Sequence, residues 1–359
     1  MKMNTLKEYG LNECFLNEAS LYPNLKPARV IAQFKGLYKI ATENSECFAE
    51  VTGKFRHDTT LVSLFPAVGD YVMVAHSDDH GHAMIHHVLT RKSSFERTAV
   101  GVTGQSQVIA TNVDVVFLCM SLNNNYNLSR LERYLSIAWS SGSTPVIVLT
   151  KSDLCDDLQK KLQEVEGIAA FSDIIVTSAL DDTVDEKIFS YLKPGITASF
   201  IGSSGVGKST LINKLMGIDA LVTAEIGKND KGRHTTTGRE MLILPNGGIV
   251  IDTPGMREIG IESADLSKSF AEIEALEAKC KFRNCTHTSE PGCAIQKALA
   301  DGLIEKRRLD NYFKIKREAK YDGLSSKEIE TSKFEMMFKE VGGMKNARRH
   351  LKEQKKQKF

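Results

Sequence analysis

The sequence of 359 residues lacks any apolar run of the roughly 20 residues that a membrane helix needs. Its longest apolar runs, 113–120 and 145–149, have the length of β-strands and are bounded by polar residues. The first residues, MKMNTLKEYGLNE, contain no apolar core of the signal-peptide type, so nothing indicates export. A cytoplasmic protein that does not bind a membrane is therefore expected.

An excess of one charge and a disulfide framework are also missing. The 47 Lys and Arg residues nearly balance the 45 Asp and Glu residues, which excludes a protein that is basic throughout. Seven cysteines are an odd number and come without a secretion signal, so a fold held by disulfides is not expected. No internal repeat and no coiled-coil pattern occurs, and we expect a monomer.

Residues 28–98 are predicted to form a small β-barrel after a leader, 1–27, that has no strong pattern. Five short segments carry the β-branched and aromatic residues of strands: ARVIAQF, GLYKIAT, CFAEVTGKF, DYVMVAH and AMIHHVL. An OB-type barrel, a frequent binder of nucleic acids, is the simplest candidate, although an SH3-like barrel would leave a similar pattern. Six of the nine histidines lie between His57 and His87, where solvated hairpin positions are favoured over a metal site.

Residues 99–262 are predicted to form an α/β nucleotide-binding domain, because apolar runs of strand length alternate with helical segments. The expected strands are VDVVFLCM, PVIVLT, DIIVTS, TASFIG and GGIVID. A helix over 128–140 would place Leu131, Leu135 and Ala138 on one face, and a second helix, STLINKLM, is expected to end at Gly217.

Residues 263–359 are predicted to form a helical zinc-binding domain with a basic tail. The segment FAEIEALEAK has a helical pattern, and a cluster of cysteines follows it. From Leu303 onward, 17 Lys and Arg residues face 9 Asp and Glu residues. Such a tail is either a solvated helix or disordered end, or the contact surface for a partner rich in phosphate.

The strongest motif is a phosphate-binding loop of the form G-x-x-x-x-G-K-[ST] between the strand TASFI and a helix. Its residues, with the one that follows, are Gly202, Ser203, Ser204, Gly205, Val206, Gly207, Lys208, Ser209 and Thr210. Glycines allow the backbone N–H groups to approach phosphates, and the helix N-terminus adds positive potential. Lys208 would reach the β- and γ-phosphates as a catalytic contact, and the Ser209 hydroxyl would bind Mg²⁺.

Asp252-Thr-Pro-Gly255 follows the strand GIVI, about forty residues after the phosphate loop. A carboxylate at the end of that strand suits Mg²⁺ held through water, so Asp252 is a predicted magnesium residue. The N–H of Gly255 could contact a γ-phosphate. These two residues complete the predicted phosphate side of the site.

Two further loops follow strands and are predicted to bind a guanine base. Thr150, Lys151, Ser152 and Asp153 come after PVIVL, and Ser178-Ala179 comes after DIIVT. The Asp153 carboxylate can accept hydrogen bonds from the N1–H and the amino group of guanine, which adenine does not offer. The Lys151 stem can lie over the base, and a backbone N–H near 178–179 can reach guanine O6. Ligands of open α/β sheets bind at such strand ends.

The order of these motifs is unusual, because most GTPases begin with the phosphate loop and read the base later in the chain. The same sheet can be built from a circularly permuted chain, and the arrangement resembles the circularly permuted GTPases. With a barrel before it and a Cys/His cluster after it, the chain most resembles the ribosome small-subunit-dependent GTPase A family over about residues 28–300. The order therefore predicts a permuted P-loop GTPase domain flanked by two smaller domains.

The resemblance implies further site residues. The first switch of the family resembles Arg233-His-Thr-Thr-Thr237, in which Thr235 or Thr236 would close on Mg²⁺. His234 is a candidate catalytic group, although a histidine of a flexible loop would look the same. Met256 stands where Ras-like enzymes carry the glutamine that orients water, so intrinsic hydrolysis is expected on the order of 10⁻⁴ to 10⁻² s⁻¹.

Three thiols and one imidazole are predicted to bind one structural zinc ion. The ligands Cys280, Cys285, His287 and Cys293 form the pattern C-x₄-C-x-H-x₅-C. Four such ligands without an open position suit tetrahedral Zn²⁺. The metal would also supply folding energy to a short, polar segment that buries little apolar surface. The spacing matches the zinc site of the family.

The sequence leaves three functions open. The resemblance implies a GTPase that checks late maturation of the small (30S) ribosomal subunit, contacts its rRNA, hydrolyses GTP to GDP when stimulated by the ribosome, and is then released. The alternatives are a GTPase that acts on the large subunit or another RNA, and a non-catalytic RNA-binding protein with GTP as a structural ligand.

Overall fold

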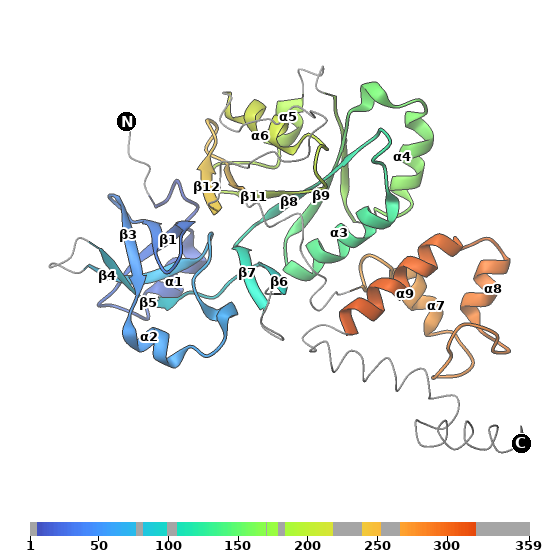
Figure 1. Cartoon of the computed structure of the whole chain (residues 1–359), viewed down its shortest axis with the longest axis horizontal. Helices are drawn as coiled ribbons and strands as arrows, with labels where there is room; N and C mark the ends of the chain where they lie inside the picture. Colours follow the sequence, from blue (N-terminus) through green and yellow to red (C-terminus); the bar gives the residue numbers. More distant parts are fainter. Residues whose placement is uncertain are drawn as a thin grey trace, which may run out of the picture.

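The computed structural model describes residues 6–76, 82–98, 106–169, 171–178, 184–217, 239–252 and 266–320. Within these ranges, no helix is long and apolar enough to cross a membrane. Figure 1 shows a β-barrel, a larger sheet with helices, and a helical C-terminal module following one another along the chain.

Five strands close the N-terminal barrel, as the sequence predicts. They are Lys26–Gln33 (β1), Tyr38–Ala41 (β2), Glu46–Val51 (β3), Tyr71–His76 (β4) and Ala83–Val88 (β5). The order is β1-β2-β3-β5-β4, and β4 pairs back with β1. Val30, Ile40 and Ile85 are fully buried in its interior. The closed five-stranded barrel is OB-like, which confirms this part of the fold.

Strand β3 is shorter than the segment CFAEVTGKF predicts. It ends at Val51, and the chain turns into a short helix, Gly53–Asp58 (α2). The Thr52 side chain accepts a hydrogen bond from the Phe55 backbone N–H at 3.1 Å. This N-cap stabilises the first turn of α2, so local capping overrides the alternating pattern of the sequence. A 3-10 helix, Val62–Leu64 (η1), precedes β4.

The segment before the barrel contains a helix that the sequence pattern did not reveal, Glu13–Ala19 (α1). Its N-cap is Asn12, whose side chain accepts from the Cys14 N–H at 3.1 Å. Phe15 packs against Tyr71 of β4, with ring centroids 4.0 Å apart. Seven residues carry too little periodicity to be recognised, and the helix is held mainly by this contact with the barrel.

The described residues of the central domain contribute six strands to its sheet, in the order β10-β9-β8-β11-β13-β12. They are Val115–Ser121 (β8), Thr144–Thr150 (β9), Asp173–Val176 (β10), Thr197–Ile201 (β11), Arg239–Ile243 (β12) and Ile249–Asp252 (β13). All pair in parallel except β12, which is antiparallel to β13. Every residue of β8 is buried, as expected for a parallel strand covered on both faces.

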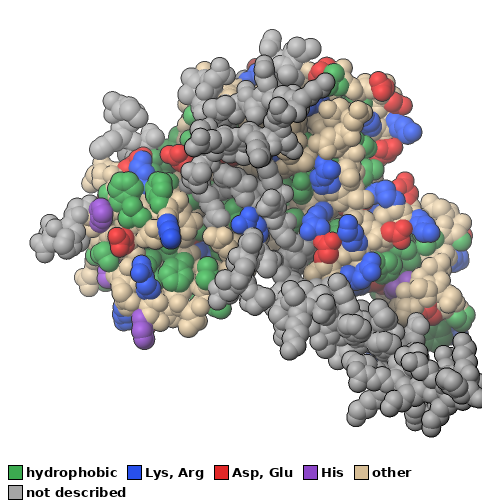
Figure 2. Space-filling view, in the orientation of Figure 1, with side chains coloured by type: hydrophobic (Ala, Val, Ile, Leu, Met, Phe, Trp, Pro, Cys, Tyr) green, Lys and Arg blue, Asp and Glu red, His purple; other side chains and the backbone are tan. Residues whose placement is uncertain are grey.

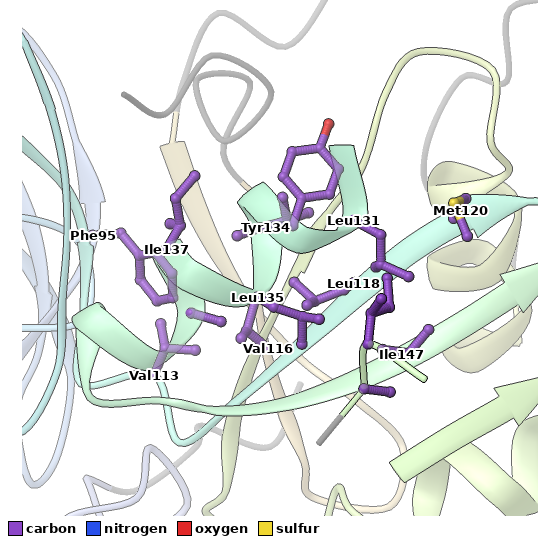
Figure 3. Packing of buried hydrophobic residues seen from close by; sticks show 14 of the residues in the cluster. Phe95, Val113, Val116, Leu118, Met120, Leu131, Tyr134, Leu135, Ile137 and Ile147 are labelled. Atoms are coloured by element: carbon purple, nitrogen blue, oxygen red, sulfur yellow. The ribbon is translucent and has the colours of Figure 1, made fainter. Parts of the chain in front are cut away.

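The helices of this domain are Leu128–Ser141 (α3), Leu158–Glu166 (α4), Val184–Phe189 (α5) and Lys208–Met216 (α6), with the 3-10 helix Ser152–Leu154 (η2). Gly217 ends α6 with a φ of 66°, as the sequence predicts, because the left-handed conformation is easiest for glycine. Figure 3 shows Leu131 and Leu135 of α3 against Val116, Leu118 and Ile147 of the sheet. This packing fixes the rotation of α3.

The barrel and the central sheet are joined by strand pairing. Strand β12 pairs with β1 through Ala32↔Glu240 and Gln33↔Arg239, so one sheet runs through both. A bulge between Val30 and Ala32 bends β1 at the junction. A separate hairpin of Ser94–Thr98 (β6) and Ser106–Thr111 (β7) connects the two parts along the chain.

A buried arginine reinforces this junction. Arg29 of β1 is 1% exposed, and its guanidinium donates to the carbonyls of Tyr9, Gly69 and Asn112 and to the Thr197 hydroxyl at 2.9 Å. These partners come from the N-terminal segment, the barrel, the hairpin connection and β11. One planar cation thus satisfies acceptors from four parts of the chain. The periodicity of the sequence gives no sign of this role.

The described part of the C-terminal module, 266–320, contains the helices Ala271–Glu277 (α7), Ala294–Ala300 (α8) and Lys306–Lys320 (α9). Helix α9 lies along α3 (Figure 1). The space-filling view shows Lys and Arg side chains of the central domain and this module interspersed with acidic ones (Figure 2). Most of the basic tail, 321–359, lies outside the described residues.

A buried carboxylate attaches α9 to α3. Glu132 is 1% exposed and accepts from Arg308 Nη1 at 2.9 Å, Arg307 Nη2 at 3.1 Å and Asn311 Nδ2 at 2.5 Å. Arg308 Nε also pairs with Glu272 of α7 at 2.5 Å. Two guanidinium groups and one amide thus satisfy the buried carboxylate, and these bonds orient the C-terminal module on the central domain.

Candidate functional site

Three glycines allow the backbone conformation of the phosphate loop and its close approach to β8. Gly205 and Gly207 have φ values of 74° and 98°, in the region that favours glycine. A Cβ on Gly202 would lie 2.5 Å from the Cys119 carbonyl oxygen, so the loop can only pass β8 without a side chain there. Val206 is buried and anchors the middle of the loop in the core beside α6.

Lys208 begins α6 and turns its ammonium into the loop. Its Nζ donates to the carbonyls of Gly202 at 2.6 Å and Ser203 at 2.8 Å. Beneath the loop, burial raises the pKa of the Cys119 thiol to about 12, against the opposing effect of the Lys208 charge, so the thiol stays neutral at physiological pH. The Lys208 ammonium thus lies against the first two residues of the loop.

The remaining residues of the loop lie around the start of α6. Ser203 and Gly205 precede α6, Ser204 is exposed between them, and Ser209 and Thr210 form its first turn. Asp252 ends β13, which pairs with β11, the strand that leads into the loop. The predicted magnesium residues Ser209 and Asp252 thus belong to neighbouring elements, α6 and β13, at the carboxyl ends of the parallel strands.

The predicted base-reading loop is bonded directly to the phosphate loop. The Thr150 hydroxyl donates to the Val206 carbonyl at 2.6 Å, and Lys151 Nζ donates to the Gly205 carbonyl at 2.7 Å. Lys151 has a φ of 57°, which turns the chain sharply after β9. The two motifs lie about fifty residues apart in the sequence, so only the fold brings them together. Thr150, where many GTPases have asparagine, here makes one of the two contacts.

Two more residues of the predicted base site contact each other. The Ser178 hydroxyl donates to Asp153 Oδ1 at 2.6 Å, and the Ser152 N–H donates to the Thr177 carbonyl at 3.1 Å. The loops after β9 and β10 therefore form one wall. Of the other predicted residues, Ala179, His234, Thr235, Thr236 and Gly255 lie outside the described residues.

Two residues beside the phosphate loop were missed by the sequence analysis. Asn125 Nδ2 and Arg130 Nη1 each donate to the Ser203 hydroxyl at 2.9 Å, and Arg130 also donates to Asn125 Oδ1 at 2.8 Å. The only signal in the sequence was the asparagine-rich turn before α3, in which Asn123 accepts from the Asn125 N–H at 3.1 Å. Such turns are common, so the pattern alone did not indicate a site.

The four predicted zinc ligands converge in the C-terminal module. Their ligand atoms all lie within 4.8 Å of one another. His287 Nδ1 is 3.6 Å from the sulfurs of both Cys280 and Cys293, and those two sulfurs are 4.0 Å apart. Around a tetrahedral zinc ion, the expected separations are about 3.6 Å for nitrogen and sulfur and about 3.8 Å for two sulfurs. The cluster, completed by Cys285, has the ligand types and the spacing of a structural zinc site.

The second ring nitrogen of His287 is held by a carboxylate. His287 Nε2 lies 3.3 Å from Glu277 Oε1, and Glu277 also accepts from the Tyr312 hydroxyl at 2.8 Å and from Lys316. Burial, followed by the bond to Glu277, raises the pKa of Tyr312, so its hydroxyl remains a donor. A proton on Nε2 directed at Glu277 leaves Nδ1 free to bind a metal, the usual arrangement around metal-binding histidines.

A largely parallel sheet carries a phosphate-loop motif at the carboxyl end of a strand, and loops from earlier in the chain bond to that motif. This is the arrangement of a circularly permuted P-loop GTPase. Comparison with known proteins agrees: the model of the RsgA GTPase family matches residues 88–262. A relative named small ribosomal subunit biogenesis GTPase RsgA 2, from Lactiplantibacillus plantarum, is 45% identical over 98% of this chain and 99% of its own. The chain therefore belongs to the RsgA GTPase family and is a GTP hydrolase.

Other relatives and two solved structures have the same character. The small ribosomal subunit biogenesis GTPase RsgA of Methanosarcina acetivorans is 40% identical over 87% of this chain and 85% of its own. The crystal structure of YjeQ from Thermotoga maritima is 28% identical, with a TM-score of 0.59 over 82% of this chain and 98% of that one. YloQ, described as a circularly permuted GTPase, is 25% identical, with a TM-score of 0.58 over 82% and 95% of the two chains. The resemblance inferred from the motifs is thus confirmed.

Proposed function

We propose that this GTPase binds the small ribosomal subunit and acts in its late maturation, in the cytoplasm, as a monomer. The observation that carries the GTPase part is the direct contact of Thr150 and Lys151 with the phosphate loop, which forms one nucleotide site from two distant motifs. The ribosomal part is supported by full-length relatives that are named for small-subunit biogenesis.

The proposed roles of the residues at the nucleotide site follow from the contacts described above. The phosphate loop, 202–210, wraps the phosphates, with Lys208 as the catalytic cation at the β- and γ-phosphates. Asp153 reads guanine, and Ser178 and Ala179 border the base. Ser209 and Asp252 bind Mg²⁺, which neutralises phosphate charge, together with Thr235 and Thr236 of the first switch. Gly255 contacts the γ-phosphate and His234 is the proposed catalytic side chain, since Met256 cannot orient water.

The proposed domains are a leader (1–27), a barrel (28–98), the permuted GTPase domain (99–262) and a zinc-binding helical domain (263–359). The barrel and the basic C-terminal region would contact rRNA, mainly through phosphates and RNA shape. The second switch, 252–255, lies shortly before α7 in the sequence. A change of nucleotide there could tilt the C-terminal module and couple hydrolysis, stimulated by the ribosome, to release.

GTP turnover with and without purified 30S subunits tests this proposal. We expect slow turnover by the protein alone and strong stimulation by 30S subunits, because the ribosome would complete a site that lacks the usual glutamine. Stimulation by 50S subunits or another RNA alone would favour a different substrate. Absence of any turnover would favour a non-catalytic RNA-binding protein that holds GTP as a structural ligand.

The base-reading role of Asp153 has its own test. Asp153→Asn should shift preference from guanosine to xanthosine nucleotides, because an amide can donate to the O2 that xanthine carries in place of the guanine amino group. Loss of one hydrogen bond to a charged group corresponds to about 1.5–3 kcal/mol, or roughly 10- to 150-fold in affinity for GTP.

Competition binding of GTP and XTP measures this shift. Asp156→Asn is the matched control, because Asp156 is an exposed carboxylate three residues further along the chain. Unchanged GTP affinity in Asp153→Asn would contradict the base-reading role.

A further inference from the structure

Helix α3 brings a further positive charge to the phosphate loop, which Lys208 and Lys151 already contact. The guanidinium of Arg130 is half-buried and bonds to the Ser203 hydroxyl and to Asn125. Among the residues that the structure describes, Arg130 forms no ion pair with a carboxylate. An arginine placed against a phosphate-binding loop without a carboxylate partner there is suited to an anionic ligand.

The contact with Ser203 lies at a defined end of the loop. Lysines in this motif bind the β- and γ-phosphates. Lys208 Nζ bonds to the carbonyls of Gly202 and Ser203, at the beginning of the loop. The beginning of the loop is therefore the β/γ end, and Arg130 reaches that same end through the Ser203 side chain.

The position of Arg130 is fixed by packing on both sides of α3. Leu131 and Leu135 are each 1% exposed and lie against the sheet, as Figure 3 shows. Glu132 is bonded to α9. The Asn127 side chain caps the helix by accepting from the Arg130 N–H at 2.9 Å. The guanidinium itself is held by its bonds to Asn125 and Ser203, so it loses less side-chain freedom when it binds a ligand, which favours affinity.

We propose that Arg130 binds the β/γ end of the triphosphate beside Lys208, with Asn125 as its positioning residue, and makes the site prefer GTP to GDP. This inference rests on the GTPase function of the site. It assigns to α3 a phosphate contact that neither the motifs nor the switches supply. GDP lacks the γ-phosphate and would gain little from Arg130.

Binding of GDP and of a non-hydrolysable GTP analogue, each with Mg²⁺, tests the proposal in the full-length protein. Arg130→Gln should lower the affinity for the GTP analogue by about 10- to 100-fold, as expected for loss of a charged hydrogen bond. The affinity for GDP should change by less than about threefold. Arg133→Gln is the matched control, because Arg133 lies on the same helix and pairs with Glu318 of α9 at 2.5 Å. The proposal would be overturned if the affinities for both nucleotides fell equally, or if neither affinity changed.

Two further variants separate phosphate binding from support of the loop. Arg130→Lys keeps the charge and should recover part of the preference for the GTP analogue. Ser203→Ala removes the hydroxyl contact and should preserve the preference. If Ser203→Ala instead reproduces Arg130→Gln while Arg130→Lys recovers nothing, Arg130 only supports the loop and the proposal is wrong. Failure of the unaltered protein to bind either nucleotide would instead contradict the proposed GTPase function.

Discussion

Lys208→Ala is expected to lower kcat/KM for GTP by about 30- to 5,000-fold, which corresponds to about 2–5 kcal/mol for a desolvated charge contact. The ammonium lies on the carbonyls at the start of the phosphate loop, and the only thiol beneath it, Cys119, remains neutral. No other residue of the loop itself carries a charge, because the rest of 202–210 consists of glycines, serines, a valine and a threonine.

Steady-state GTP hydrolysis, with 30S subunits present, measures this effect. Lys160→Ala is the matched control, since Lys160 is an exposed lysine of α4 in the same domain. Thermal unfolding of both variants shows whether the fold is kept. Turnover by a folded Lys208→Ala variant at the rate of the control would show that the phosphate loop is not the catalytic site.

Removal of the metal is expected to unfold the C-terminal module. Structural zinc sites contribute about 10–16 kcal/mol of apparent binding free energy, which here would be folding energy for the segment around Cys280 and Cys293. Purified protein should contain about one zinc per chain, and Cys285→Ser should lose most of it, because three ligands do not close a structural site. Helix α9 should then loosen, since Phe313 stacks on the His287 ring with centroids 5.8 Å apart.

Metal analysis and the fluorescence of Trp139 measure these two changes. Trp139 is the single tryptophan and lies in α3, with Lys268 Nζ 4.4 Å from the centre of its ring. Loosening of the chain after residue 266 should therefore alter its emission. Cys14→Ser is the control, because Cys14 is an exposed thiol far from the cluster in the sequence. A metal-free protein with an unchanged C-terminal module would contradict this prediction.

The attachment of α9 to α3 would connect a metal bound at the Cys/His cluster to the central domain. The ligand His287 is backed by Glu277, and Glu277 is held by Tyr312 and Lys316 of α9. The same helix contacts Glu132 through Arg308, and α3 carries Arg130 at the phosphate loop. A continuous set of contacts thus joins the Cys/His cluster to the phosphate loop.

Local sequence patterns were sufficient to predict many of the secondary-structure elements and motifs of this protein. The five barrel strands, the buried strand β8 and the stop of α6 at Gly217 depend on alternation, apolar run length and the left-handed preference of glycine, which act over a few residues. The phosphate loop and the Cys/His cluster were equally accessible, because their chemistry requires fixed residue types at short spacings. Helix α1 and the early end of β3 were not, because a tertiary contact and a side-chain cap decided them.

The amino-acid order alone therefore determined the type of each domain, the motif residues and their permuted arrangement. Tertiary structure decided how these parts meet: Thr150 on the Val206 carbonyl, Arg29 at the junction of barrel and sheet, Glu132 beneath α9, and Arg130 at Ser203. The bonds of Thr150, Glu132 and Arg130, and the bond of Arg29 to Thr197, each join residues more than fifty positions apart. None of them follows a periodicity. Their formation depends on strand pairing and helix packing, which bring polar groups together where burial requires that each find a partner.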